Sequence, residues 1–141
     1  MSLDIRPFQD SDADDVVGLW HAAGLVRPWN DPHLDIERKK AVQRDLFLVA
    51  ADDGRILGTG MAGYDGHRGW VNYLAVQPDA RRDGIGRALM SEFERRLRAL
   101  GCPKVNLQVR AGNDEALAFY ARLGYTEDVV VSLGKRLIPD D

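Results

Sequence analysis

The sequence predicts an α+β fold with a central mixed sheet flanked by helices. One observation is that three apolar runs lie close together between residues 46 and 76, joined by short turns, as in a meander of adjacent strands. Another is that the apolar runs at 70–76 and 104–109 are separated by a long amphipathic segment, as in a strand–helix–strand unit. A meander combined with such units predicts a sheet that is mixed and mostly antiparallel.

The first third of the chain is predicted to form one strand and two helices. Residues 3–8 alternate weakly, which favours a strand, and residues 11–14 offer a helix cap with acids in the first turn. Apolar residues recur at helical spacing from 16 to 23, and Gly24 is expected to end that helix. After a segment interrupted by two prolines, a polar helix with a thin apolar face is expected over 32–44.

The rest of the chain is predicted to add five or six strands and two helices. The dipeptide Asp53-Gly54 is a hairpin signal, and apolar residues from Ile85 to Leu100 mark one face of a long helix that Gly101 ends. We therefore expect strands at 46–51, 56–64, 70–76 and 104–109, one or two last strands between 129 and 137, and helices at 85–100 and 116–123.

Length and composition predict one domain that spans residues 1–141, because 45% of the 141 residues are hydrophobic and 29% are charged. The net charge of -3 argues against general nucleic-acid binding, which needs many contacts from Lys and Arg to phosphate. Cys102 is the only cysteine, which excludes a disulfide within the chain and a cysteine-rich zinc site. The histidines His21, His33 and His67 show no metal-ligand spacing, so we expect no bound metal.

Targeting and membrane segments are not predicted. The N-terminal residues lack the basic-then-apolar order of a signal peptide. No apolar run approaches the roughly 18 residues that a membrane-spanning helix needs. We therefore expect a cytoplasmic protein without a membrane partner.

The most informative segment joins the strand at 70–76 to the helix at 85–100. It contains Gly84 and Gly86, with three arginines beside them. A helix start offers unpaired backbone N–H groups and the positive end of its dipole, glycine lets a ligand approach the backbone, and arginine adds charge. The combination suits a pyrophosphate. The alternative is that the glycines only shape a tight helix start and the arginines are solvated.

Two better-known phosphate-binding loops do not match this segment. The dinucleotide fingerprint needs a third glycine or an alanine where this chain has Leu89. The P-loop needs Gly-Lys followed by Ser or Thr, and the chain has no such triplet. The segment therefore predicts a phosphate-binding loop of another kind.

A second segment, residues 113–125, follows the next strand and reads Asn-Asp-Glu-Ala-Leu-Ala-Phe-Tyr-Ala-Arg-Leu-Gly-Tyr. Together with Arg81-x-x-Gly84-x-Gly86, it resembles the GNAT family of acetyl-CoA-dependent N-acetyltransferases, and the resemblance covers essentially the whole chain. Three further segments are similar to the small bacterial members of the YpeA type: 27–32, 64–69 and 132–137. The resemblance implies the GNAT-like fold, in which the fourth and fifth strands splay apart.

The resemblance also implies that acetyl-CoA is the acyl donor. In the family, the pantetheine arm lies between the splayed strands and pairs with the fourth, and the pyrophosphate meets backbone N–H groups at the helix start. Arg81 matches a Gln/Arg position of the family, and Asn113 matches a position that contacts the cofactor arm. The residues that the resemblance assigns to the cofactor are Leu74, Ala75, Val76, Arg81, Arg82, Asp83, Gly84, Ile85, Gly86, Arg87, Ala88, Asn113 and Tyr120.

The resemblance assigns Tyr120 the role of catalytic acid. Acetyl transfer turns the CoA sulfur into a thiolate leaving group. A phenol with an ordinary pKa of about 10 is protonated at neutral pH and can hydrogen-bond or protonate that sulfur. The alternative is a packing tyrosine, because Phe119, Tyr120 and Leu123 lie at spacings that suit a helix–sheet interface.

The general base is left open by the sequence. Many relatives carry a glutamate on the fourth strand, whereas this chain has Asn-Tyr-Leu-Ala at 72–75. Glu37, Asp65 and His67 are candidates, and for each the alternative is a structural or merely exposed side chain. A base that acts through water, or a substrate amine of low pKa, would need none of them.

The acceptor site is expected on the first loop and on the turn between the third and fourth strands. Its candidate residues are Arg27, Trp29, Asn30, Asp31, Asp65, His67 and Arg68. An exposed set of mixed charge suggests a small polar amine or a peptide terminus as acceptor.

We therefore expect an N-acetyltransferase that transfers an acetyl group from acetyl-CoA to a primary amine by direct attack in a ternary complex. One alternative is a non-catalytic acyl-CoA-binding sensor or partner-binding domain. Another is a nucleotide-binding domain that uses the same loop, although no metal-binding Ser or Thr follows the glycines. A homodimer through the last strands is expected by analogy with the family alone.

Overall fold

The computed structural model describes residues 2–141, and its five strands form one sheet in the order of the sequence. The strands are β1 (Asp4–Pro7), β2 (Phe47–Asp52), β3 (Arg55–Tyr64), β4 (Gly69–Val76) and β5 (Val105–Leu107), and the helices are α1 (Ala13–Ala22), α2 (Pro32–Lys40), α3 (Ile85–Ala99) and α4 (Asp114–Arg122). The first three pairings are antiparallel, and β4 pairs with β5 in parallel. The predicted α+β fold with a mixed, mostly antiparallel sheet is thus confirmed.

The described chain divides into two compact units. Residues 2–107 with 140–141 form the larger unit, and residues 108–139, which contain α4, form the smaller. The prediction of one domain over 1–141 stays a prediction.

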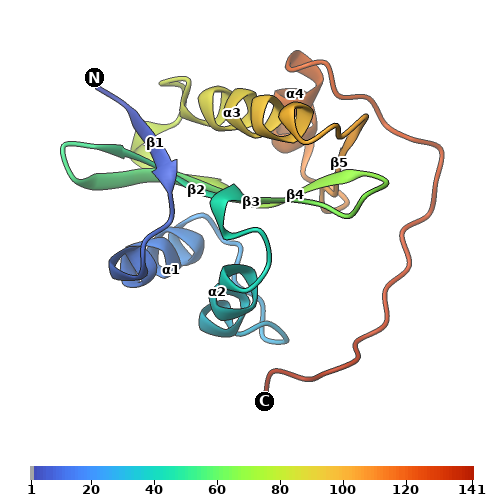
Figure 1. The fold of residues 1–141 in the computed structure, drawn as a ribbon, viewed down its shortest axis with the longest axis horizontal. Helices are drawn as coiled ribbons and strands as arrows, with labels where there is room; N and C mark the ends of the chain where they lie inside the picture. Colours follow the sequence, from blue (N-terminus) through green and yellow to red (C-terminus); the bar gives the residue numbers. More distant parts are fainter. Residues whose placement is uncertain (1) are drawn as a thin grey trace. The chain divides into compact units, whose positions relative to one another are not determined.

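In the larger unit, α1 and α2 cover one face of the sheet and α3 covers the other (Figure 1). Trp20 of α1 and Ile36 of α2 are fully buried with Phe47 of β2 in a core on the first face. On the other face, Leu89 and Phe93 of α3 are fully buried. The sheet therefore has an apolar layer on each side, and burial of both layers stabilises the fold.

The turn between β2 and β3 follows from the dipeptide that predicted it. Asp53 and Gly54 have φ angles of 50° and 79°, the two left-handed residues that a type I′ turn requires. Asp52 pairs with Arg55 directly across the turn. The hairpin prediction is confirmed.

Strand β4 carries one residue more than β3 across a β-bulge. Met61 pairs with Asn72, whereas Thr59 pairs with Ala75, so two residues of β4 lie opposite Gly60. Tyr73 has a φ of 55° there, in the left-handed region that bulky side chains rarely adopt. The bulge therefore places a strained aromatic residue in the middle of the sheet.

Strand β4 pairs with β5 only over the first three residues of β4. Gly69 to Val71 pair with Val105 to Leu107, and the β4 residues from 72 to 76 have no strand partner on that side within the larger unit. The sheet is open along this part of β4, as the predicted splay of the fourth and fifth strands requires.

The last strands predicted between 129 and 137 are wrong. This part of the chain contains no strand, and Val129, Val130 and Val131 are exposed. The N–H of Val130 donates to the carbonyl of Asp128 at 3.0 Å, as in a tight turn rather than a ladder. β-Branched residues favour a strand only where their side chains pack against neighbours, and here they do not.

The helices differ from prediction only at their ends. The helix expected over 32–44 ends at Lys40, and Gln43, with a φ of 50°, begins a short 3-10 turn, Arg44–Leu46. Across residues 2–141, every helix is too short or too polar to traverse a lipid bilayer.

We predict that Gly60→Ala destabilises the protein by about 1–3 kcal/mol. A Cβ at Gly60 would lie 2.8 Å from Cε2 of Phe93, a fully buried ring that has no room to swing away. The measurement is the free energy of unfolding in urea.

The matched control is Gly18→Ala on the exposed side of α1, where a Cβ meets nothing within 4 Å. This variant is expected to stabilise the protein by about 0.5–1 kcal/mol, because alanine favours the helix over glycine. Equal effects of the two substitutions would contradict the packing argument.

Candidate functional site

The N-terminus of α3 lies directly after the open part of β4. The chain leaves β4 at Val76, makes a short 3-10 turn, Pro78–Ala80, and enters α3 through Gly84, whose φ is 80°. Ala88 is the first residue whose N–H bonds back into the helix, to the carbonyl of Gly84 at 3.0 Å, and no side chain caps the helix. The three N–H groups before Ala88 therefore lack intrahelical acceptors.

This helix start differs in charge from those of the other helices. Asp31 caps α2 and Asn113 caps α4 through side-chain oxygens that accept backbone N–H groups. The first turns of these helices and of α1 carry acids, namely Asp14, Asp15, Asp35, Asp114 and Glu115. The first turn of α3 carries none, so no carboxylate in that turn offsets the positive end of the helix dipole.

The side chains around this start favour an anion as well. Arg81, Arg82 and Arg87 are exposed, whereas Gly86 is buried at the second helical position. Arg82 has a φ of 77° and Gly84 a φ of 80°, so two residues of the loop, on either side of Asp83, are in the left-handed region. Backbone N–H groups in such a loop form a concavity for phosphate oxygens, and the arginines add positive charge.

The smaller unit holds the two other residues predicted at the site. Tyr120 lies on α4, and its ring centroid lies 4.9 Å from that of Phe119 and 5.8 Å from that of Tyr125. Burial raises the pKa of Tyr120 to about 12, so its hydroxyl is protonated at neutral pH. The Oδ1 of Asn113 accepts the N–H of Ala116 at 3.1 Å, which gives Asn113 a structural role as the cap of α4.

The predicted acceptor residues lie on two separate segments. On the loop before α2, Arg27 donates to the carbonyl of Gly24 at 2.9 Å, and Trp29 is 55% exposed next to Asn30. Asp31 follows them as the cap of α2. Arg27 and Asp31 thus take part in local structure.

In the turn between β3 and β4, Asp65 accepts the backbone N–H groups of His67 and Arg68, each at 2.8 Å. The N–H groups of Arg68 and His67 hold the pKa of the Asp65 carboxyl below its usual range. The role of Asp65 in forming the turn makes it a poor proton acceptor. Glu37 is 65% exposed and pairs with Lys40 at 2.9 Å, so neither carboxylate is arranged as a base.

No pattern in the sequence indicates the contact between Tyr73 and Asp35. The Tyr73 hydroxyl donates to Oδ2 of Asp35 at 2.6 Å, and the Tyr73 ring stacks on Trp20 with centroids 4.0 Å apart. Burial and the neighbouring carboxylate raise the pKa of Tyr73 well above its ordinary value. The two residues are 38 positions apart, so only the packing of α2 on the sheet brings them together.

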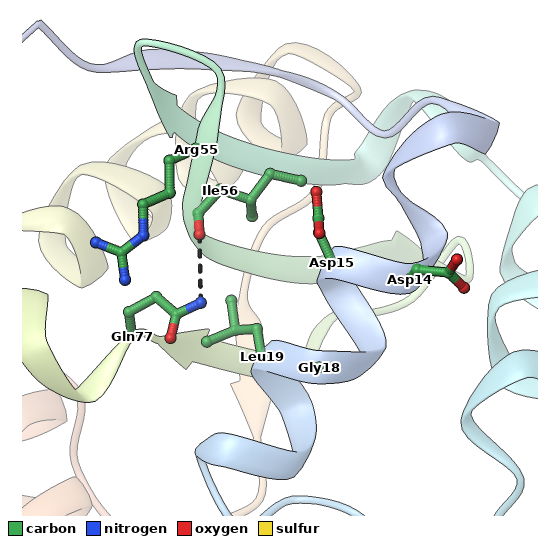
Figure 2. Close-up of a pocket in the computed structure, with 7 residues that line it drawn as sticks. All are labelled: Asp14, Asp15, Gly18, Leu19, Arg55, Ile56 and Gln77. Atoms are coloured by element: carbon green, nitrogen blue, oxygen red, sulfur yellow. Dashed lines mark hydrogen bonds between the residues drawn. The ribbon is translucent and has the colours of Figure 1, made fainter.

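A surface pocket of about 280 Å³ lies elsewhere in the larger unit, between α1, the first residues of β3 and the residue that follows β4. Its lining residues are Asp14, Asp15, Gly18, Leu19, Arg55, Ile56 and Gln77. Figure 2 shows the Gln77 amide donating to the carbonyl of Ile56, at 3.4 Å. None of the predicted site residues lines this pocket, and it is smaller than most ligand sites.

Residues 2–141 contain no group of three or more His, Cys, Asp or Glu side chains that could hold a metal ion. The prediction that the protein binds no metal stays a prediction.

Known proteins are similar to this chain in sequence. Residues 14–125 match the sequence model of the Acetyltransferase (GNAT) family. A protein of Sodalis glossinidius (strain morsitans) that is named as an acetyltransferase is 51% identical over 139 residues, which are 98% of each chain.

Solved structures share the fold. Ard1 from Thermoplasma volcanium matches with a TM-score of 0.73 and 27% identity, over 89% of this chain and 84% of that one. AAC(6')-Iy, solved with the bisubstrate analogue CoA-S-monomethyl-acetylneamine, matches with a TM-score of 0.79 over 97% of this chain and 100% of that one. Its identity is 20%, so this likeness concerns the fold alone.

The YpeA type remains a prediction, whereas the family follows from the match over residues 14–125 and from the 51% identity. The chain belongs to the acetyltransferase (GNAT) family and is an acyltransferase.

Proposed function

We propose that this protein transfers an acetyl group from acetyl-CoA to a primary amine in a ternary complex. The observation that carries the proposal is the N-terminus of α3, which has no cap and no acid in its first turn and follows the open edge of β4. A ligand with an extended arm and a pyrophosphate fits that arrangement. The edge of β4 offers main-chain groups to the arm, and the helix start offers N–H groups to the phosphates.

The residues present fit acetyl-CoA. Leu74 and Val76 are half-buried on the open part of β4, and their main-chain groups would pair with the pantetheine arm. The backbone between Arg82 and Ala88 would bind the pyrophosphate, with Gly86 allowing close approach. A nucleotide held with a metal ion fits less well, because no Ser or Thr follows the glycines.

When bound, acetyl-CoA supplies a thioester whose acyl group forms a bond to the amine nitrogen as the carbon–sulfur bond breaks. Main-chain N–H groups of β4 would polarise the carbonyl oxygen, because charge develops on that oxygen during attack. Tyr120, protonated at neutral pH, would donate a hydrogen bond to the departing sulfur. Water would carry the proton away from the amine, since residues 72–75 of β4 include no acid.

The acceptor would be a small polar amine or a peptide terminus, bound by the loop that contains Arg27, Trp29 and Asn30 and by the turn that contains Asp65 and His67. Exposed Trp29 offers an apolar surface beside charged groups, which suits an amine on a short carbon chain. The experiment is to offer a panel of amines and peptides with acetyl-CoA and to measure the release of free CoA thiol.

A second candidate function is a non-catalytic acyl-CoA-binding domain. The observation that favours it is the absence of an acid among residues 72–75. Binding of acetyl-CoA without thiol release for any amine in the panel would support this candidate over the first.

We predict that Arg87→Glu weakens CoA binding by roughly tenfold or more, because a charge-assisted contact to phosphate is replaced by repulsion. The same change is expected to stabilise the free protein by about 0.3–1 kcal/mol, since an acid in the first turn complements the helix dipole. Calorimetric titration with CoA and thermal unfolding measure the two effects.

Arg98→Glu, in the last turn of the same helix, is the matched control. It opposes the dipole, so it should lower thermal stability slightly while CoA affinity stays at the wild-type value. A loss of CoA affinity that is the same in both variants would remove the N-terminus of α3 from the proposed site.

We predict that Tyr120→Phe lowers turnover roughly 10- to 100-fold, the size expected for one hydrogen bond to a charged group. Acetyl-CoA affinity should survive, because the substitution leaves the open edge of β4 and the start of α3 unchanged. Steady-state thiol release and calorimetric titration separate the two quantities. Unchanged turnover would remove Tyr120 from the mechanism.

The raised pKa of Tyr120 predicts a pH dependence of stability. In the folded protein its pKa is about 12, above the value of about 10 for an unfolded tyrosine, so the unfolded state loses this proton first as pH rises. The stabilising contribution is fully present below about pH 10 and is lost as pH rises towards 12. Between pH 8 and pH 11, unfolding in urea should show a smaller loss of stability for Tyr120→Phe than for wild type. Parallel losses would contradict the assignment.

A further inference from the structure

The backbone of Tyr73 is strained and needs an external restraint. A side-chain-bearing residue in the left-handed region costs roughly 1–2 kcal/mol, and glycine is the usual occupant of that place in a bulge. Tyr73 holds a φ of 55° in the middle of β4. Such a conformation persists only where the surrounding structure fixes it.

Two contacts to other elements fix the Tyr73 side chain. Its hydroxyl donates to Oδ2 of Asp35 on α2 at 2.6 Å, a short bond to a carboxylate. Its ring lies on Trp20 of α1 at 4.0 Å, with 16° between the planes. The buried Nε1 of Trp20 has no hydrogen-bond partner in the described chain, so Trp20 restrains Tyr73 by stacking alone.

The Asp35 carboxylate is itself held in place. Nη1 of Arg38 lies 3.4 Å from Oδ1 of Asp35, and Nη2 of the same guanidinium lies 2.8 Å from Oδ1 of Asp140. The other oxygen of Asp140 accepts the N–H of Asp31 at 2.7 Å, and the Asp140 side chain is only 6% exposed. Asp35 therefore has partners at both oxygens, with Oδ2 accepting from Tyr73 and Oδ1 paired with Arg38.

The backbone that Tyr73 sets in place is the part of β4 that faces the open edge. The pairing with β5 ends at Val71, and the bulge begins two residues later, at Tyr73. The orientation of the peptide groups on either side of Tyr73 depends on its φ and ψ angles. The contact with Asp35 therefore determines the direction of the main-chain N–H and C=O groups at residues 73–74.

We propose that Asp35 is a positioning residue, which through the Tyr73 hydroxyl holds the bulge of β4 so that its main-chain N–H groups meet the thioester carbonyl of acetyl-CoA. The inference rests on the proposed function. It adds α2 to the acyl-transfer site without a direct contact between Asp35 and the substrate.

The test compares the binding of acetyl-CoA with that of ethyl-CoA, a thioether that lacks the carbonyl oxygen, and it needs no acceptor. The wild-type protein is expected to bind acetyl-CoA roughly fivefold more tightly, the value of about one hydrogen bond. Tyr73→Phe, which keeps the ring on Trp20, and Asp35→Ala should both bring this ratio towards one, because any change in pairing with the pantetheine arm affects both ligands alike. Asp35→Asn keeps an oxygen acceptor and should keep the ratio.

Asp12→Asn is the matched control for general destabilisation. Asp12 pairs with Arg6 of β1 at 2.7 Å, and β2 and β3 separate β1 from β4. This variant should unfold at a lower temperature with the ratio of affinities intact. Loss of the ratio in Asp12→Asn as well would overturn the inference, because the effect would then follow stability.

The remaining outcomes are distinct. An unchanged ratio in Tyr73→Phe and Asp35→Ala overturns the inference, and if Asp35→Ala fails to fold, Tyr73→Phe decides. Equal affinity of the wild-type protein for the two ligands also overturns it, while the proposed use of acetyl-CoA stands. Failure of the wild-type protein to bind either ligand overturns the proposed function, and the inference with it.

Discussion

The extra residue in β4 is the constraint on which the larger unit depends. Side chains alternate along a regular strand, so Gly69 and Ala75 would face the same side. Instead, a Cβ at Gly69 would meet Leu97 of α3 at 3.2 Å, whereas Ala75 packs in the core with α1 and α2. The bulge at Tyr73 reverses the alternation, and β4 thereby contributes to both apolar layers.

The reversal also sets the direction of the Tyr73 side chain and of the main chain that follows it. Tyr73 turns its side chain towards α1 and α2, whereas the main chain that follows it lines the open edge and leads into the start of α3. Gly60 lies opposite the bulge, where only hydrogen leaves room for Phe93. Packing of α3 and the strain at Tyr73 are thus set at one place in the sheet.

Features that depend on neighbouring residues could be predicted from the sequence. The hairpin follows from Asp53-Gly54, because both residues tolerate a positive φ, and the loop before α3 follows from Gly84 for the same reason. The long helix follows from apolar residues that recur on one face. These predictions need no knowledge of distant parts of the chain.

Features that depend on residues far away along the chain could not be predicted from the sequence. A bulge is usually marked by glycine, and Tyr73 takes that place only because Asp35, 38 residues earlier, and Trp20 hold it. Val129 and Val130 have the local preference of a strand, but a strand also needs a partner, and both side chains are exposed. The sequence carries no local signal for either outcome.

The pKa of Tyr120 bears on how the proposed thiolate leaves. A thiol has an ordinary pKa of about 8.5, whereas burial raises that of Tyr120 to about 12. Full proton transfer from this phenol to a thiolate would be unfavourable by more than three orders of magnitude, from the difference of about 3.5 between these values. A hydrogen bond from the phenol stabilises the negative sulfur without that transfer, and water can then protonate the product. Burial thus suits Tyr120 to stabilise the leaving group as a donor rather than to act as a strong acid.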